Sequence, residues 1–137
     1  MKTKVDVTWT KDMAFEALVN DHIVLLDADE NAGGHEFGPR PKPLLLVALG
    51  GCTGMDVISI LKKMKVHPEY FSVHVEGELT DEHPKVYHTV TITYVFRGQD
   101  LEREKLEKAI SLSQEKYCGV SAMLGKAAKL QFKLIIE

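Results

Sequence analysis

Residues 44–65 carry a long and largely apolar pattern that any fold of this chain has to accommodate. The segment contains no proline, and His67-Pro68 follows it, which predicts one helix ending near Lys65. At ~1.5 Å per residue this helix is roughly 33 Å long, about the width of a compact domain of this size. The 137 residues make about one domain's length, so we expect a single domain, residues 1–137.

The first half of this helix, residues 44–52 (LLLVALGGC), is apolar on every side. A helix that is apolar all round must be covered all round, whereas one small sheet covers a single face. The pattern therefore favours a homodimer in which two such helices pack together. Gly50, Gly51 and Gly54 break up the apolar run, so we expect a buried helix and no membrane partner.

Alternating apolar and polar residues predict strands on both sides of the helix. Three short strands are expected before it, with a turn at Asn20-Asp21 and one ordered glycine- and proline-rich loop after the third, and three more strands are expected later. The expected strands cover residues 5–9, 13–19, 22–27, 71–79, 86–96 and 130–136. Those at 71–79 and 86–96 read as an antiparallel hairpin. The sequence thus predicts an α+β fold with antiparallel sheets around a long central helix.

A second helix is expected between the hairpin and the last strand. Asp100 is its predicted N-cap, an apolar stripe follows, and the helix should end near Cys118-Gly119. A short apolar turn or helix over residues 120–128 then leads into the last strand.

Charge and cysteine usage exclude several classes of protein. Twenty acidic and 17 basic residues are spread along the chain, whereas a nucleic-acid-binding protein would show a basic stripe, so no nucleic-acid partner is expected. The N-terminus alternates polar and apolar residues, which is not typical of a secretory signal, and predicts a cytoplasmic protein. Cys52 and Cys118 lie in no CxxC pair of the kind found in zinc sites and thioredoxin-like motifs. Any role that they have is therefore expected to depend on their thiol groups.

Residues 48–64 (ALGGCTGMDVISILKKM) and 112–127 (LSQEKYCGVSAMLGKA) resemble the two cysteine segments of the OsmC and organic hydroperoxide resistance (Ohr) superfamily, specifically its short, OsmC-like branch. The order of strands and helices is similar over essentially the whole chain. The resemblance implies an intertwined homodimer.

It also implies thiol-dependent peroxidase activity in oxidative-stress defence, with organic hydroperoxides as substrates, an external dithiol as reductant and no cofactor. Cys52 would be the peroxidatic thiol and Cys118 the resolving one. The neighbourhood of Leu45, Leu49 and Met55 would accept an alkyl chain. Taken alone, each cysteine is as well explained as a buried packing residue.

The chain departs from the family pattern beside the reactive cysteine. The resemblance implies an arginine against that thiol, held by a glutamate in the first turn of the central helix, but Pro43 occupies the glutamate position. Arg40 is the only arginine in the preceding loop, and with Glu36 it could replace the usual pair. An exposed loop salt bridge explains the same two residues.

Other polar residues near Cys52 allow alternatives. Asp56 lies one helical turn after Cys52, where a carboxylate raises a thiol pKa unless it orients a cation. His35 and Glu36 could join Cys52 around a metal, but no known ligand spacing matches and no metal site is expected. A rival function is therefore a non-catalytic dimeric module that binds a small apolar ligand or senses oxidants through Cys52.

Overall fold

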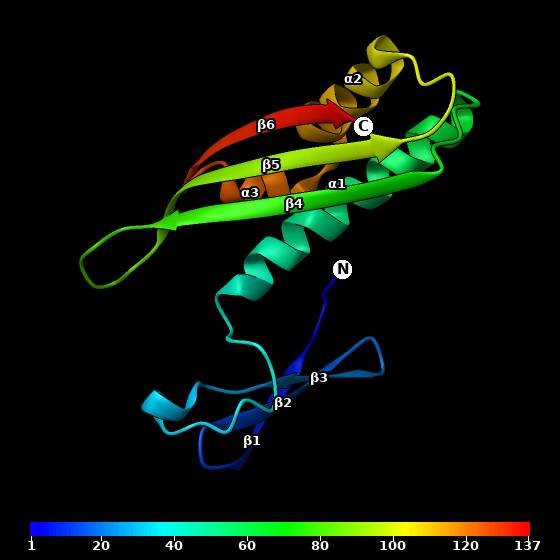
Figure 1. Ribbon diagram of the computed structural model, residues 1–137. Coiled ribbons are helices and arrows are strands. Elements are labelled where there is room, and N and C mark those ends of the chain that lie inside the picture. The colour runs from blue at the N-terminus through cyan, green and yellow to red at the C-terminus, as the bar shows by residue number, and fades with distance from the viewer. The chain divides into compact units, whose positions relative to one another are not determined.

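A computed structural model describes all residues, Met1–Glu137, and its elements are labelled in Figure 1. The chain divides into two compact units, an N-terminal unit of Met1–Leu45 and a C-terminal unit of Leu46–Glu137. Each unit is described by itself.

The N-terminal unit is a three-stranded antiparallel sheet in the order β1-β2-β3. Its strands are β1 (Asp6–Lys11), β2 (Ala14–Val19) and β3 (His22–Leu26). Asn20 and Asp21 both have positive φ angles, 49° and 66°, as the tight turn of a two-residue hairpin requires. The three expected strands and this turn are confirmed.

The N-terminal sheet has almost no hydrophobic core of its own. Every residue of β1 is exposed, including Trp9 at 63%, and Ala17 and Asp27 are the only side chains of this unit that are fully buried. The loop that follows β3 contains the 3-10 turn η1 (Glu30–Ala32) and is ordered by internal hydrogen bonds.

The long helix is α1 (Pro43–Lys63), close to the expected bounds. Its buried residues are Leu49, Thr53, Val57 and Leu61, which recur every four residues and so lie on one face. The opposite face is exposed, including Val47 (65%) and Met55 (78%).

By length and composition alone α1 could cross a membrane, with a mean hydropathy of 2.0 over its most apolar window. Its packing argues for a core helix instead. One face lies against the sheet of the C-terminal unit, and central helices of proteins outside membranes pass the same test of length and composition.

That sheet has the order β4-β5-β6 (Figure 1). Its strands are β4 (Tyr70–Leu79), β5 (Tyr87–Arg97) and β6 (Lys129–Ile136). β4 and β5 form the expected antiparallel hairpin, but β6 pairs with β5 in parallel. The expectation of wholly antiparallel sheets needs this correction: the chain leaves β5 at one end and crosses back through helices before β6 begins.

The crossover consists of α2 (Arg103–Leu112), a π-helical turn η2 (Ser113–Tyr117) and α3 (Gly119–Leu124). The prediction that Asp100 caps α2 is wrong. Asp100 has a positive φ of 57° in the preceding turn, and Glu102 occupies the N-cap without a side-chain hydrogen bond. The core lies between the sheet and these helices and contains alternate residues of β5 and one face of α2: Val90, Ile92, Tyr94, Phe96, Leu106, Ala109 and Ile110.

Candidate thiol site

Cys52 and Cys118 come together in the C-terminal unit, one from α1 and one from the residue that joins η2 to α3. Their Sγ atoms and a carboxylate oxygen of Asp56 all lie within 4.8 Å of one another. Cys52 is half-buried, whereas Cys118 is only 3% exposed. Helical spacing places Asp56 one turn after Cys52, and the crossover brings Cys118 to the same side of α1.

The first turn of α3 acts on both cysteines. Cys118 is the N-cap of α3, and its Sγ accepts the N–H of Ser121 at 3.3 Å. The backbone of Val120 lowers the pKa of the Cys52 thiol. The N–H of Cys118 itself donates to the carbonyl oxygen of Ser113 at 2.7 Å, which fixes the backbone at this joint.

A buried chain of hydroxyl groups ends at Asp56. Gln114 Nε2 lies 2.6 Å from Tyr94 OH, Tyr94 OH lies 2.7 Å from Thr53 Oγ1, and Thr53 Oγ1 lies 2.8 Å from Ser113 Oγ. Ser113 Oγ donates to Asp56 Oδ2 at 3.0 Å. An amide NH₂ only donates and a carboxylate only accepts, so each hydroxyl along the chain donates toward Asp56.

The surroundings of Cys52 disfavour its thiolate. Burial raises the pKa of the Cys52 thiol, Cys118 and the Asp56 carboxylate raise it further, and the backbone of Val120 partly offsets them. The expected effect of Asp56 on this pKa is therefore confirmed. The groups that act most strongly on Cys52 include no cation.

Arg40 and Glu36, the expected activating pair, belong to the N-terminal unit. Their side chains form an ion pair, and Arg40 Nη1 also donates to the carbonyl oxygen of Asp27 at 3.3 Å. Their side chains are 38% and 54% exposed, respectively, as the loop salt-bridge alternative expects. A role for either residue at Cys52 stays a prediction.

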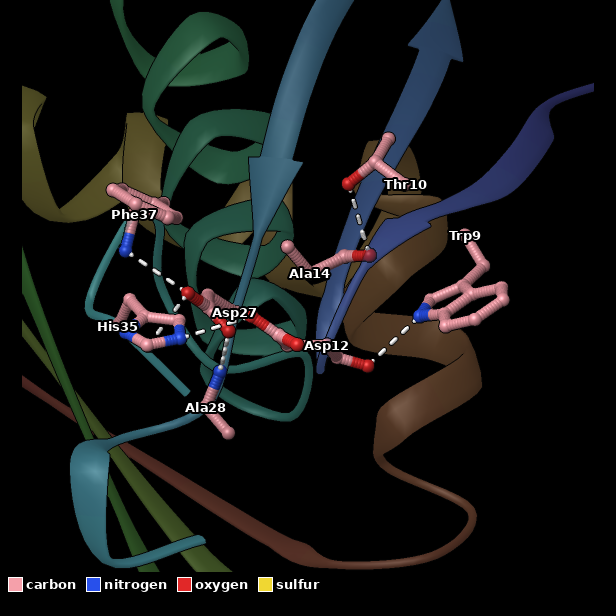
Figure 2. Close-up of polar contacts among 8 residues, drawn as sticks. All are labelled: Trp9, Thr10, Asp12, Ala14, Asp27, Ala28, His35 and Phe37. Carbon is pink, nitrogen blue, oxygen red and sulfur yellow. Dashed lines mark hydrogen bonds and ion pairs between the residues drawn. The ribbon is translucent and has the colours of Figure 1, made fainter. Parts of the chain in front are cut away.

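Asp27, which sequence reasoning missed, organises the loop that carries this pair. Its buried carboxylate accepts the N–H groups of Ala28, His35 and Phe37 at 2.7, 3.0 and 3.2 Å (Figure 2). These bonds, that of His35 first, lower the pKa of Asp27. The ring of His35 contacts Asp12 at 3.0 Å, so this imidazole already has a carboxylate partner.

Leu49 does not lie on an accessible surface as the alkyl-chain interpretation requires. Its side chain is fully buried against the sheet, because it belongs to the same face of α1 as Thr53. Leu45 and Met55, the other two residues of that interpretation, are exposed, as is Val47 between Leu45 and Cys52.

Comparison with known proteins identifies the family. Residues 33–133 match the family model described as OsmC-like protein. The chain belongs to the OsmC-like family. It is 32% identical to Protein YhfA of Escherichia coli (strain K12) over 125 residues, which cover 90% of each chain.

Solved structures of other proteins have the same fold. A hypothetical protein from Aquifex aeolicus VF5 is 30% identical, with a TM-score of 0.88 and coverage of 100% of this chain and 97% of the other. An organic hydroperoxide resistance protein OsmC from Legionella pneumophila has a TM-score of 0.70 at 14% identity, with coverage of 98% and 97%. The suspected family and its α+β fold are confirmed.

Proposed function

We propose that this OsmC-like protein is a thiol-dependent hydroperoxide reductase in which Cys52 attacks the peroxide and Cys118 resolves the product. The observation that carries the proposal is the proximity of the two sulfur atoms, which lie within 4.8 Å of each other although the residues are far apart in sequence. Two thiols this close need only a small movement to form a bond of about 2.05 Å.

The reaction requires two thiols and one peroxide. The Cys52 thiolate attacks the terminal peroxide oxygen, the O–O bond breaks, the alkoxide takes up a proton, and Cys52 becomes a sulfenic acid. The thiolate of Cys118 then attacks the Cys52 sulfur, the S–S bond forms, and the hydroxyl group leaves as water after protonation. An external dithiol returns both residues to thiols by exchange and is itself oxidised.

The residue proposed to move in this reaction is Cys118, through its side chain. It follows the π-helical turn η2 (Ser113–Tyr117) and has extended backbone angles, whereas Cys52 lies within the continuous helix α1. Single π turns within helices often occur at functional sites, and here such a turn ends at the resolving residue.

Activation of Cys52 needs a cation, since its local surroundings raise its pKa. Arg40, held by Glu36, is proposed to supply it. Arg40→Ala should then slow the reaction of Cys52 with cumene hydroperoxide without unfolding the protein. Unchanged kinetics would make Arg40 a surface residue and leave Lys42 as the next candidate.

The protein is proposed to work in the cytoplasm as a homodimer of single-domain chains. The exposed apolar face of α1, opposite its sheet-facing side, needs a cover, and a second copy of the same helix supplies a matching one. The family match supports a single domain, because residues 33–133 extend across the boundary between the two compact units.

The test is intact-mass analysis after one equivalent of cumene hydroperoxide, with a chelator present throughout. The wild type should lose two hydrogen masses and both alkylatable thiols. Cys52→Ser should not consume peroxide, whereas Cys118→Ser should complete one turnover and accumulate sulfenic acid at Cys52. Two free thiols after treatment of the wild type would refute the peroxidase proposal.

The raised pKa of Cys52 favours a second candidate, a non-catalytic module that binds a small apolar ligand or senses oxidants. The rate of Cys52 alkylation as a function of pH distinguishes the two. An apparent pKa well below ~8.5 supports the reductase, and one at or above this value supports the module.

A further inference from the structure

Three groups that bind metals as anions face one another at the thiol site. Cys52 and Cys118 offer two sulfur ligands and Asp56 offers an oxygen, with all three ligand atoms within 4.8 Å of one another. In a four-coordinate zinc site, with Zn–S near 2.3 Å and Zn–O near 2.0 Å, neighbouring ligand atoms are separated by roughly 3.5–3.8 Å. Each side chain therefore needs to move by about an ångström or less.

Two of these three groups also have a hydrogen-bond donor behind them. The N–H of Ser121 donates to the sulfur of Cys118, and the hydroxyl of Ser113 holds the Asp56 carboxylate. Donors of this kind orient metal ligands and stabilise their negative charge.

The hydrogen bond from Ser113 leaves the Asp56 carboxylate able to bind a cation. The hydroxyl chain from Gln114 through Tyr94 delivers one hydrogen bond to Oδ2, and no salt bridge involves Asp56. Its carboxylate thus retains an oxygen for a cation. A half-buried Cys52 beside a buried Cys118 leaves the solvent side of the cluster for a fourth ligand.

We propose that Cys52, Cys118 and Asp56 bind a thiophilic divalent cation, Zn²⁺, in a four-coordinate site whose fourth ligand is water. Two thiolates with one carboxylate suit Zn²⁺, whereas Mg²⁺ and Ca²⁺ prefer oxygen ligands alone. The site uses ligands from α1 and from the crossover, so the short spacing of a zinc motif is absent, which is why the sequence predicts no metal. The metal holds both sulfurs and thereby prevents them from forming a disulfide with each other.

The experiment titrates reduced, chelator-treated protein with Co²⁺ under nitrogen, in the absence of any peroxide. The wild type should develop a thiolate-to-cobalt charge-transfer band in the near ultraviolet that saturates at one metal per chain and disappears when Zn²⁺ is added. Cys52→Ser and Cys118→Ser should each lose about half of the band, since one of two thiolates is gone. Cobalt bound only at surface histidines gives no such band.

Asp56→Asn tests the oxygen ligand while preserving an acceptor for Ser113. It should weaken Co²⁺ binding at least about tenfold. The matched control is Glu115→Gln, which removes an exposed carboxylate from η2, in the crossover that carries Cys118, and should leave the affinity unchanged.

Absence of the band in the wild type at excess Co²⁺, or its full retention in both cysteine variants, overturns the site. Equal affinities for Asp56→Asn and Glu115→Gln overturn the role of Asp56. If a cysteine variant fails to fold, the wild type alone tests the site. Bound Zn²⁺ should protect Cys52 from alkylation, which peptide mass analysis measures. The peroxide assay runs in chelator, so failure of either proposal leaves the other testable.

Discussion

Thr53→Val tests the buried hydroxyl chain with almost no change of shape. Thr53 is fully buried, and its Oγ1 lies 2.7 Å from Tyr94 OH and 2.8 Å from Ser113 Oγ. Valine replaces the hydroxyl by a methyl group, so no cavity forms and the two short hydrogen bonds are lost. At about 1 kcal/mol for each bond, the free energy of unfolding should fall by about 1–3 kcal/mol.

The middle of that range is expected, because each partner keeps one hydrogen bond while the Tyr94 hydroxyl proton loses its acceptor. Tyr94 OH keeps the bond from Gln114, and Ser113 Oγ keeps its bond to Asp56. Tyr94→Phe, which removes the Tyr94 hydroxyl, should be less damaging in the Thr53→Val background than in the wild type. Such a difference would measure the coupling within the chain.

Urea unfolding at one fixed protein concentration measures the effect, because the stability of an oligomer depends on concentration. Thr93→Val is the matched control. Thr93 is a half-buried threonine of β5 whose side chain makes no hydrogen bond to another residue. The urea midpoint of the Thr93→Val protein should therefore differ little from that of the wild type. A Thr53→Val protein as stable as the control would refute the claim that the chain stabilises the fold.

Three further results are expected. Asp56→Asn should speed alkylation of Cys52 at neutral pH in chelator, since loss of the carboxylate lowers the thiol pKa; an unchanged rate would contradict this electrostatic effect. The lowered pKa of Asp27 stabilises the fold at pH values above ~3.9, the pKa of an unperturbed Asp, and this stabilisation is lost as the pH falls through the pKa that Asp27 has in the folded protein. Asp27→Asn should therefore make the melting temperature less dependent on pH in that acid range. Ala48→Glu places a charge on the exposed face of α1 and should abolish the dimer in sedimentation, and an intact dimer would exclude this face from the interface.

Apolar patterning, read together with the positions of proline, glycine and turn residues, located all the strands and the long helix. It could not specify the direction in which β6 pairs with β5, since alternation is identical in parallel and antiparallel strands. The misplaced cap at Asp100 has a similar cause. Capping preferences name suitable residues, but the turn before α2 gives Asp100 a positive φ and moves the cap to Glu102.

The thiol pair was expected from the family resemblance rather than from the residues themselves, because nothing local in the sequence joins Cys52 to Cys118. The hydroxyl chain was missed, although a signal was present. Ser113 falls on the apolar stripe of the second helix, where a small polar residue requires a buried partner. Thr53 occupies a similar place on α1.

The parallel pairing of β5 with β6 has a consequence for the order in which the protein folds. The hairpin of β4 and β5 joins neighbouring segments, but β6 reaches β5 only after the crossover of α2, η2 and α3 has closed a long loop. Cys118 lies inside that loop. We therefore expect the two thiols to meet late in folding, so that a chain that has formed only the hairpin presents Cys52 and Cys118 as separate thiols, each free to react with other molecules.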